Sequence, residues 1–137
     1  MKIGFTGTRQ GMSEAQKIAL KVLLKKYEKR SAVDVVNEFH HGGCEGADLE
    51  AGEIARKLHY AVVVHPGGAT ALPLAAKLFA SRVLPERPNL KRNQDIVDVA
   101  DLVIAAPRTS TEELRSGTWA TLRYAKRQNK ALKMLDR

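Results

Sequence analysis

The sequence has a single cysteine and no long hydrophobic run. Cys44 is the only cysteine among 137 residues, which excludes an internal disulfide. Apolar residues nowhere continue for the roughly 18 positions that a membrane-spanning helix needs. The first residues predict a strand and not a signal peptide. We therefore expect a cytoplasmic protein with no membrane partner.

Aromatic residues are also scarce, at 5% of the chain, which argues against a broad surface for stacking single-stranded bases. Positive charge, by contrast, is plentiful, and the formal net charge is +8. Two basic groups lie in or beside predicted helices: Lys17, Lys21, Lys25 and Lys29 in the first, and Arg123, Lys126, Arg127 and Lys130 in and just after the last. They are either solvated faces or together a surface for a polyanion such as nucleic acid.

Short apolar segments alternate with amphipathic ones along the chain. We predict strands at residues 2–6, 34–40, 60–65, 102–106 and 131–135. A capping box at Ser13 and Gln16 begins a helix that runs to about residue 30. Further helices are predicted at residues 47–58, 74–81, 89–100 and 117–129, with Asn89 and Ser116 as caps, and an irregular loop precedes Asn89.

This alternation indicates right-handed βαβ units in a parallel sheet covered on both faces. We expect one α/β domain over residues 1–137, with a Rossmann-like sheet of about five strands in the order 3-2-1-4-5. Such sheets bind ligands beyond the carboxyl ends of the strands, where the strand order reverses. The loops that begin at Gly7, His41 and Pro107 should therefore converge.

Glycine-rich turns follow the first two predicted strands. The second turn contains Gly42, Gly43 and Gly46. A strand-to-helix turn of this kind presents backbone N–H groups beside a helix N-terminus, which suits a phosphate. The first turn contains Gly7, Thr8 and Arg9, and an arginine there can bind a phosphate or a carboxylate through its forked guanidinium. Two such turns predict a nucleotide-type ligand.

Further candidates for ligand binding each have a structural alternative. Asp48 is an acid–base group, a ribose-binding group or only the cap of its helix. Arg92 and Asn93 either contact a phosphate and a sugar or base, or pack within the fold. The segment Ser116-Gly117-Thr118 offers hydroxyls and free N–H groups, or is an ordinary helix start.

The sequence lacks the motifs that mark several common enzyme classes and metal sites. Neither glycine turn matches the G-x-G-x-x-G fingerprint or carries the lysine of a P-loop, which disfavours dinucleotide dehydrogenases and P-loop NTPases. His40, His41 and Cys44 are too few soft ligands for a zinc site, and we predict no metal. Cys44 has no defined base beside it that would make it a nucleophile.

Four segments together, in their order and spacing, resemble the SLOG superfamily of Rossmann-like proteins. They are Gly7-Thr8-Arg9, residues 42–48, Arg92-Asn93 and residues 116–121. The superfamily includes the DNA-processing protein A (Smf) domain and the LOG-type phosphoribohydrolases, and this chain is most similar to small stand-alone members of the DNA-processing branch. The resemblance implies a pocket for a nucleotide-derived ligand or for nucleic-acid phosphate. In the DNA-processing branch, the corresponding region binds single-stranded DNA.

The LOG branch takes its catalytic carboxylate from a P-G-G-x-G-T-x-x-E loop after the fourth strand. This chain departs from that pattern, with Pro107-Arg108-Thr109-Ser110-Thr111 there instead. The remaining candidate carboxylates are Glu45, Glu112 and Glu113. Three functions stay open: a module that binds a nucleotide-derived molecule, an accessory protein for single-stranded nucleic acid, and an enzyme acting on an N-glycosidic bond. A homo-oligomer is also left open.

Overall fold

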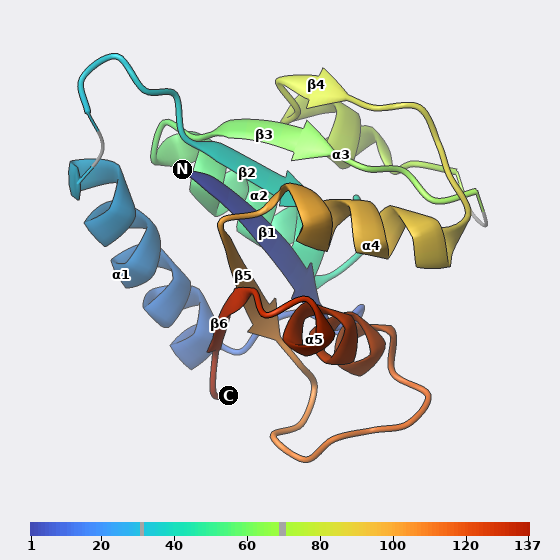
Figure 1. Ribbon diagram of the computed structural model, residues 1–137. Helices are drawn as coiled ribbons and strands as arrows, with labels where there is room; N and C mark the ends of the chain where they lie inside the picture. The colour runs from blue at the N-terminus through green and yellow to red at the C-terminus, as the bar shows by residue number, and fades with distance from the viewer. Residues whose placement is uncertain (31, 69–70) are drawn as a thin grey trace.

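The computed structural model describes residues 1–30, 32–68 and 71–137 (Figure 1). Its strands form one parallel sheet in the order β4-β3-β2-β1-β5-β6. They are β1 (Lys2–Gly7), β2 (Glu38–His41), β3 (Ala61–Val64), β4 (Arg82–Val83), β5 (Leu102–Ala106) and β6 (Ala131–Met134). The predicted α/β, Rossmann-like class is confirmed.

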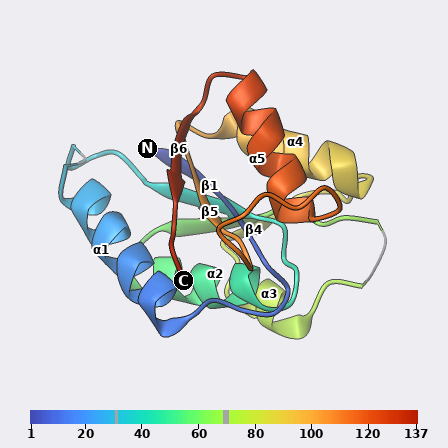
Figure 2. The same cartoon turned by 90° about the horizontal axis from the view of Figure 1, so that it is seen from below.

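Helices cover both faces of this sheet. They are α1 (Glu14–Arg30), α2 (Ala47–Lys57), α3 (Leu74–Leu78), α4 (Asn89–Val99) and α5 (Gly117–Arg127). Figure 2 shows α1 and α2 on one face and α4 and α5 on the other. The larger core lies under α1 and α2, where Leu24 and Ala51 pack with Phe39 of β2. On the opposite face, Val97 of α4 packs against Val103 of β5.

The expected strand order is correct for five strands, but the sheet has one more strand at its edge. β4 lies in the segment that we expected to be an irregular loop. Its flanks bond to the free edge of β3, because Ser81 N donates to Val62 O at 2.8 Å and Leu84 N to Val64 O at 2.9 Å. Pro85 and Pro88 follow closely, and proline cannot continue a sheet ladder, so the strand is only two residues long.

The second strand starts later than the predicted residues 34–40. Its apolar residues Val35 and Val36 are exposed, and β2 begins at Glu38. The reason is the lack of a partner, since Glu38 N donates to Met1 O at 3.0 Å, at the point where β1 itself begins. A β-branched run without a neighbouring strand has no ladder to join.

Helix starts agree well with their sequence signals. Ser13 and Gln16 form the predicted capping box, with N–H to side-chain oxygen distances of 3.0 and 3.1 Å. Ser116 caps α5 by accepting a hydrogen bond from Trp119 N at 3.3 Å. Asn89 is the first residue of α4 and not its cap, a position that Pro88 occupies. Within the described ranges, none of the helices is long and apolar enough to cross a membrane.

Candidate functional site

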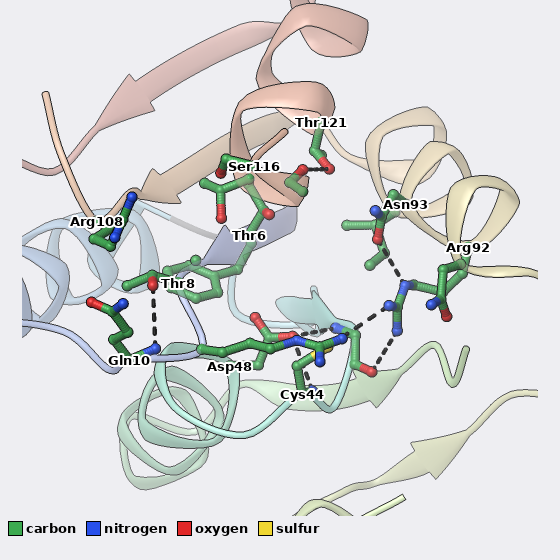
Figure 3. Close-up of a pocket in the computed structure, with 18 of the residues that line it drawn as sticks. Thr6, Thr8, Gln10, Cys44, Asp48, Arg92, Asn93, Arg108, Ser116 and Thr121 are labelled. Atoms are coloured by element: carbon green, nitrogen blue, oxygen red, sulfur yellow. Dashed lines mark hydrogen bonds between the residues drawn. The ribbon is translucent and has the colours of Figure 1, made fainter. Parts of the chain in front are cut away.

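A cavity of about 540 Å³ lies beyond the carboxyl ends of β1 and β5 (Figure 3). This is the point where the strand order reverses, since β1 lies between β2 and β5. Loops after β1, β2 and β5 all contribute to its wall, which confirms their predicted convergence. Most of the residues predicted to bind a ligand line it: Gly7, Thr8, Arg9, Gly42, Asp48, Arg92, Asn93, Ser116, Gly117 and Thr118.

Two of the predicted glycines, Gly43 and Gly46, are outside this lining. Gly46 has a φ of +85° and caps α2, and a Cβ on it would lie 2.3 Å from the Arg9 carbonyl oxygen. Gly43 has a φ of +72° and faces Leu72 and Val64. Both glycines therefore shape the turn behind the cavity wall, and a contact with a ligand stays a prediction.

The two glycine turns are joined at their backbones. Thr8 O accepts a hydrogen bond from Ala47 N at 3.0 Å, and Thr8 N donates to Ala106 O at 3.1 Å. A Cβ on Gly7 would lie 2.5 Å from the Cβ of Ala47, so glycine is what permits α2 to start this close to β1. Arg9 follows at the rim, exposed to solvent.

Asp48 lies in the first turn of α2, directly after the second glycine turn, and is only 5% exposed. Its Oδ2 accepts hydrogen bonds from Gly42 N and Cys44 N, each at 3.2 Å, so it ties the loop before its helix and does not cap the helix itself. Burial raises the pKa of Asp48 to about 6, although the Cys44 N–H and the Arg92 guanidinium favour the charged form. Its other oxygen, Oδ1, has no hydrogen-bond partner in the described part of the chain.

Arg92 is 6% exposed and connects α4 to the loops after β2 and β3. Its Nη1 donates to Gly42 O at 2.7 Å and to His65 O at 3.0 Å. Its Nε donates to Asn93 Oδ1 at 2.7 Å. Most of the N–H donors of Arg92 are therefore hydrogen-bonded within the protein, which favours the prediction that Arg92 packs within the fold over the prediction that it contacts a phosphate. Arg92 nevertheless lines the cavity.

The loop after β5 forms the opposite wall. Arg108 and Glu113 both line the cavity and form a close ion pair, which holds the pKa of Glu113 below its usual range. Arg115 follows, exposed at the rim. Gly117 and Thr118 begin α5, and the first N–H groups of a helix have no partner within it.

The three candidate carboxylates do not gather around one point. Glu113 lines the cavity but is paired with Arg108. Glu112 pairs with Arg123 at 3.6 Å, outside the lining. Glu45 lines a smaller hollow beside Arg9 and Gly43. These three residues thus provide no pair of free carboxylates for general acid and base chemistry.

The histidines near Cys44 are occupied within the fold. His40 lies on the α4 face of the sheet, with its two ring nitrogens 2.8 Å from His65 Nε2 and from Glu38 Oε1. His41 packs against Gly52 of α2 and accepts a hydrogen bond from Gly43 N at 2.9 Å. Burial lowers the pKa of His41 to about 3 and that of His65 to about 4. Burial also raises the pKa of the Cys44 thiol.

Sequence reasoning missed part of the lining: Phe5, Thr6, Gln10, Asn89, Ile96, Arg108, Arg115 and Thr121. Arg108 and Arg115 could have been found, because they follow a strand whose carboxyl end was predicted to face the ligand. Ile96 and Thr121 could not, because they lie inside helices whose rotation is set by packing.

Solved structures of known proteins share this fold. DNA processing protein A from Streptococcus pneumoniae has a TM-score of 0.70 at 18% identity, over 97% of this chain and 49% of that one. The Helicobacter pylori protein, whose structure concerns single-stranded DNA binding, has a TM-score of 0.68 at 20% identity, over 98% and 64%. The molybdenum cofactor carrier protein of Chlamydomonas reinhardtii has a TM-score of 0.67 at 16% identity, over 97% and 74%.

This chain therefore spans about half the length of the Streptococcus protein. No family model and no curated protein matches the sequence. The shared architecture shows that this chain has the same fold as these three proteins.

Proposed function

We propose that the cavity binds a nucleotide-derived small molecule and holds its phosphate at the rim. The observation that carries this proposal is the convergence of Arg9, Arg108 and Arg115 with the start of α5 on one cavity. Forked guanidinium groups and the N–H groups of a helix N-terminus both bind phosphate oxygens well. A volume of about 540 Å³ is also in the range of small-molecule sites.

The structural neighbours support a small-molecule occupant. The same fold occurs in a molybdenum cofactor binding protein from Rippkaea orientalis, with a TM-score of 0.69 at 17% identity. A fold that takes a small-molecule cofactor in one protein can serve a related ligand here, although function is decided by the site and not by the fold.

Calorimetric titration with AMP and with inorganic phosphate tests the proposal. Substitution of Arg115→Gln should weaken AMP binding about tenfold or more, because a charge-assisted hydrogen bond contributes about 1.5–3 kcal/mol. Arg30→Gln, at the far end of α1, makes the same change of charge and should alter affinity less than about twofold. Absence of AMP and phosphate binding to the native protein, or equal losses in both variants, would refute the proposal.

A second candidate function is binding of single-stranded nucleic acid. It is favoured by the net charge of +8 and by the fold shared with the DNA-binding Helicobacter protein. The two predicted basic groups do not form one surface, however, because α1 and α5 lie on opposite faces of the sheet (Figure 2). Lys17 is also partly neutralised by Glu50 at 3.2 Å and Glu14 at 3.4 Å. Any contact through α1 would therefore rest on Lys21, Lys25 and Lys29.

A further inference from the structure

One buried oxygen atom of a residue that lines the cavity finds no partner among the described residues. Asp48 lines the cavity, and only its Oδ2 is used by the fold, in accepting the N–H groups of Gly42 and Cys44. Its Oδ1 is buried and accepts no hydrogen bond from residues 1–30, 32–68 or 71–137. Figure 3 shows Asp48 on the wall formed by the second turn, across the cavity from Ser116.

An unpartnered buried carboxylate oxygen is costly, at about 1–3 kcal/mol or more, and native structures contain few such atoms. In the described part of the chain, the other buried side-chain atom of this kind is Trp119 Nε1, which lies outside the cavity lining. A bound molecule that donates to Asp48 Oδ1 would remove this cost. The atom therefore points to a ligand group.

The kind of ligand group that can bind here follows from the acceptor capacity that the Asp48 carboxylate has left. Pairing with an amidine-like edge of a base would need both carboxylate oxygens, and Oδ2 already accepts two backbone bonds. A single hydroxyl needs only one acceptor. A cationic group is disfavoured because the Arg92 guanidinium lies beside Asp48 and further arginines line the rim. A phosphate is repelled from the carboxylate itself and is directed toward those arginines.

We propose that Asp48 Oδ1 accepts a hydrogen bond from a ribose hydroxyl of the ligand, so that the cavity selects nucleotides that carry this hydroxyl over analogues that lack it. This inference rests on the proposed function, because the phosphate of the same molecule occupies the arginine rim. The ligand then lies with its sugar toward the second turn and its phosphate toward the loop after β5.

The test compares AMP, 2′-deoxy-AMP and 3′-deoxy-AMP by calorimetry at pH 8. The native protein should bind AMP about tenfold or more tightly than the analogue that lacks the contacted hydroxyl. Asp48→Asn should reduce this preference to about twofold or less. Its amide carbonyl can keep the bonds from Gly42 and Cys44, which turns the NH₂ group toward the ligand and replaces an acceptor with a donor.

Two controls separate the explanations. Inorganic phosphate should bind Asp48→Asn at least as well as it binds the native protein, since the rim is intact and one negative charge is gone. Glu53→Gln, on the exposed side of α2, should keep the full preference for AMP.

Equal affinity of the native protein for all three nucleotides overturns the inference, whether or not the variant folds, and leaves the proposed function standing. A preference for AMP that survives in a folded Asp48→Asn protein also overturns it. Failure of the native protein to bind AMP and phosphate at all refutes the inference and the proposed function together.

Discussion

At the scale of single residues, Asp48 shows an opposition between stability and binding. Its carboxyl group is buried, only one of its oxygens is hydrogen-bonded within the described residues, and its pKa of about 6 lies above the ordinary value of 3.8. The folded protein therefore holds this proton more tightly than the unfolded chain does. At pH 8, where the carboxyl group is ionised in both states, the buried charge lowers the free energy of unfolding. As the pH falls below about 6, the carboxyl group becomes protonated in the fold and the cost decreases, until it is lost near pH 4, where the unfolded chain is protonated as well.

We therefore expect Asp48→Asn to raise the free energy of unfolding at pH 8, by on the order of 1–3 kcal/mol. The gain should shrink at pH 5, where the native carboxyl group is itself mostly neutral. Urea unfolding of both proteins at the two pH values measures this. His41 and His65, with their lowered pKa values, destabilise the fold as the pH falls below about 6.5, but they do so in both proteins and cancel in the comparison. A loss of stability at pH 8, or a gain that is the same at both pH values, would contradict the expectation.

At the scale of elements, the turn between β2 and α2 is held by close backbone approach. Gly46 combines a φ of +85° with a backbone neighbour, Arg9, where a side chain would have to go. Its role is thus to let the first turn pass against the second. This also sets where Arg9 leaves the backbone at the rim of the cavity.

Substitution of Gly46→Ala should lower the free energy of unfolding by about 1–3 kcal/mol, because an L residue is strained at this φ and its Cβ meets the Arg9 carbonyl. Gly68→Ala is the matched control, since Gly68 is exposed and a Cβ there would meet nothing within 4 Å. Its effect should stay within about 0.5 kcal/mol. Chemical denaturation measures both, and equal stabilities of the two variants would show that the turn relaxes freely.

The elements also show what a sequence can and cannot predict. Periodicity, the capping box at Ser13 and the apolar run of β5 depend on neighbours along the chain, and these predictions were confirmed. The carboxyl-end rule correctly brought Arg9 and Asp48 to one cavity. β4 was missed because its two residues are a strand only through the edge of β3, a contact made in space. The ion pair of Arg108 with Glu113 likewise depends on how a loop folds back on itself.

At the scale of the whole molecule, positive charge is divided between two faces. The helices α1 and α5, which carry most of the two basic groups, lie on opposite sides of the sheet, so the two groups do not form one continuous surface (Figure 2). A nucleic-acid surface on α1 would extend over Lys21, Lys25 and Lys29, away from the cavity. Small-molecule binding and DNA binding are then separable by mutation.

Fluorescence anisotropy with a labelled oligonucleotide at ~50 mM salt should detect weak, sequence-independent binding that falls steeply with added salt. Replacing Lys21 and Lys25 with glutamate should reduce the log–log slope by about 0.7 for each phosphate that the protein no longer neutralises, and AMP binding should not change. Replacing Lys126 and Arg127 with glutamate is the control with the same change of charge on the other face, and it should leave the slope unaltered. If the oligonucleotide does not bind at this salt concentration, nucleic-acid binding is refuted and small-molecule binding is the one proposed function that remains.

The central place of β1 in the sheet has a consequence for the order of folding. Ile3 pairs with Phe39 on one side and with Leu102 on the other, so its neighbours are 36 and 99 positions further along the chain. Contacts that close such long loops form slowly, because the chain loses conformational entropy on closing the loop before the free energy of the new contacts can offset that loss. The β1–β2–β3 half can assemble by successive short crossovers, whereas the β1–β5 pair must wait for the longer closure. Since the cavity lies at the carboxyl ends of that pair, we expect the binding site to form late in folding.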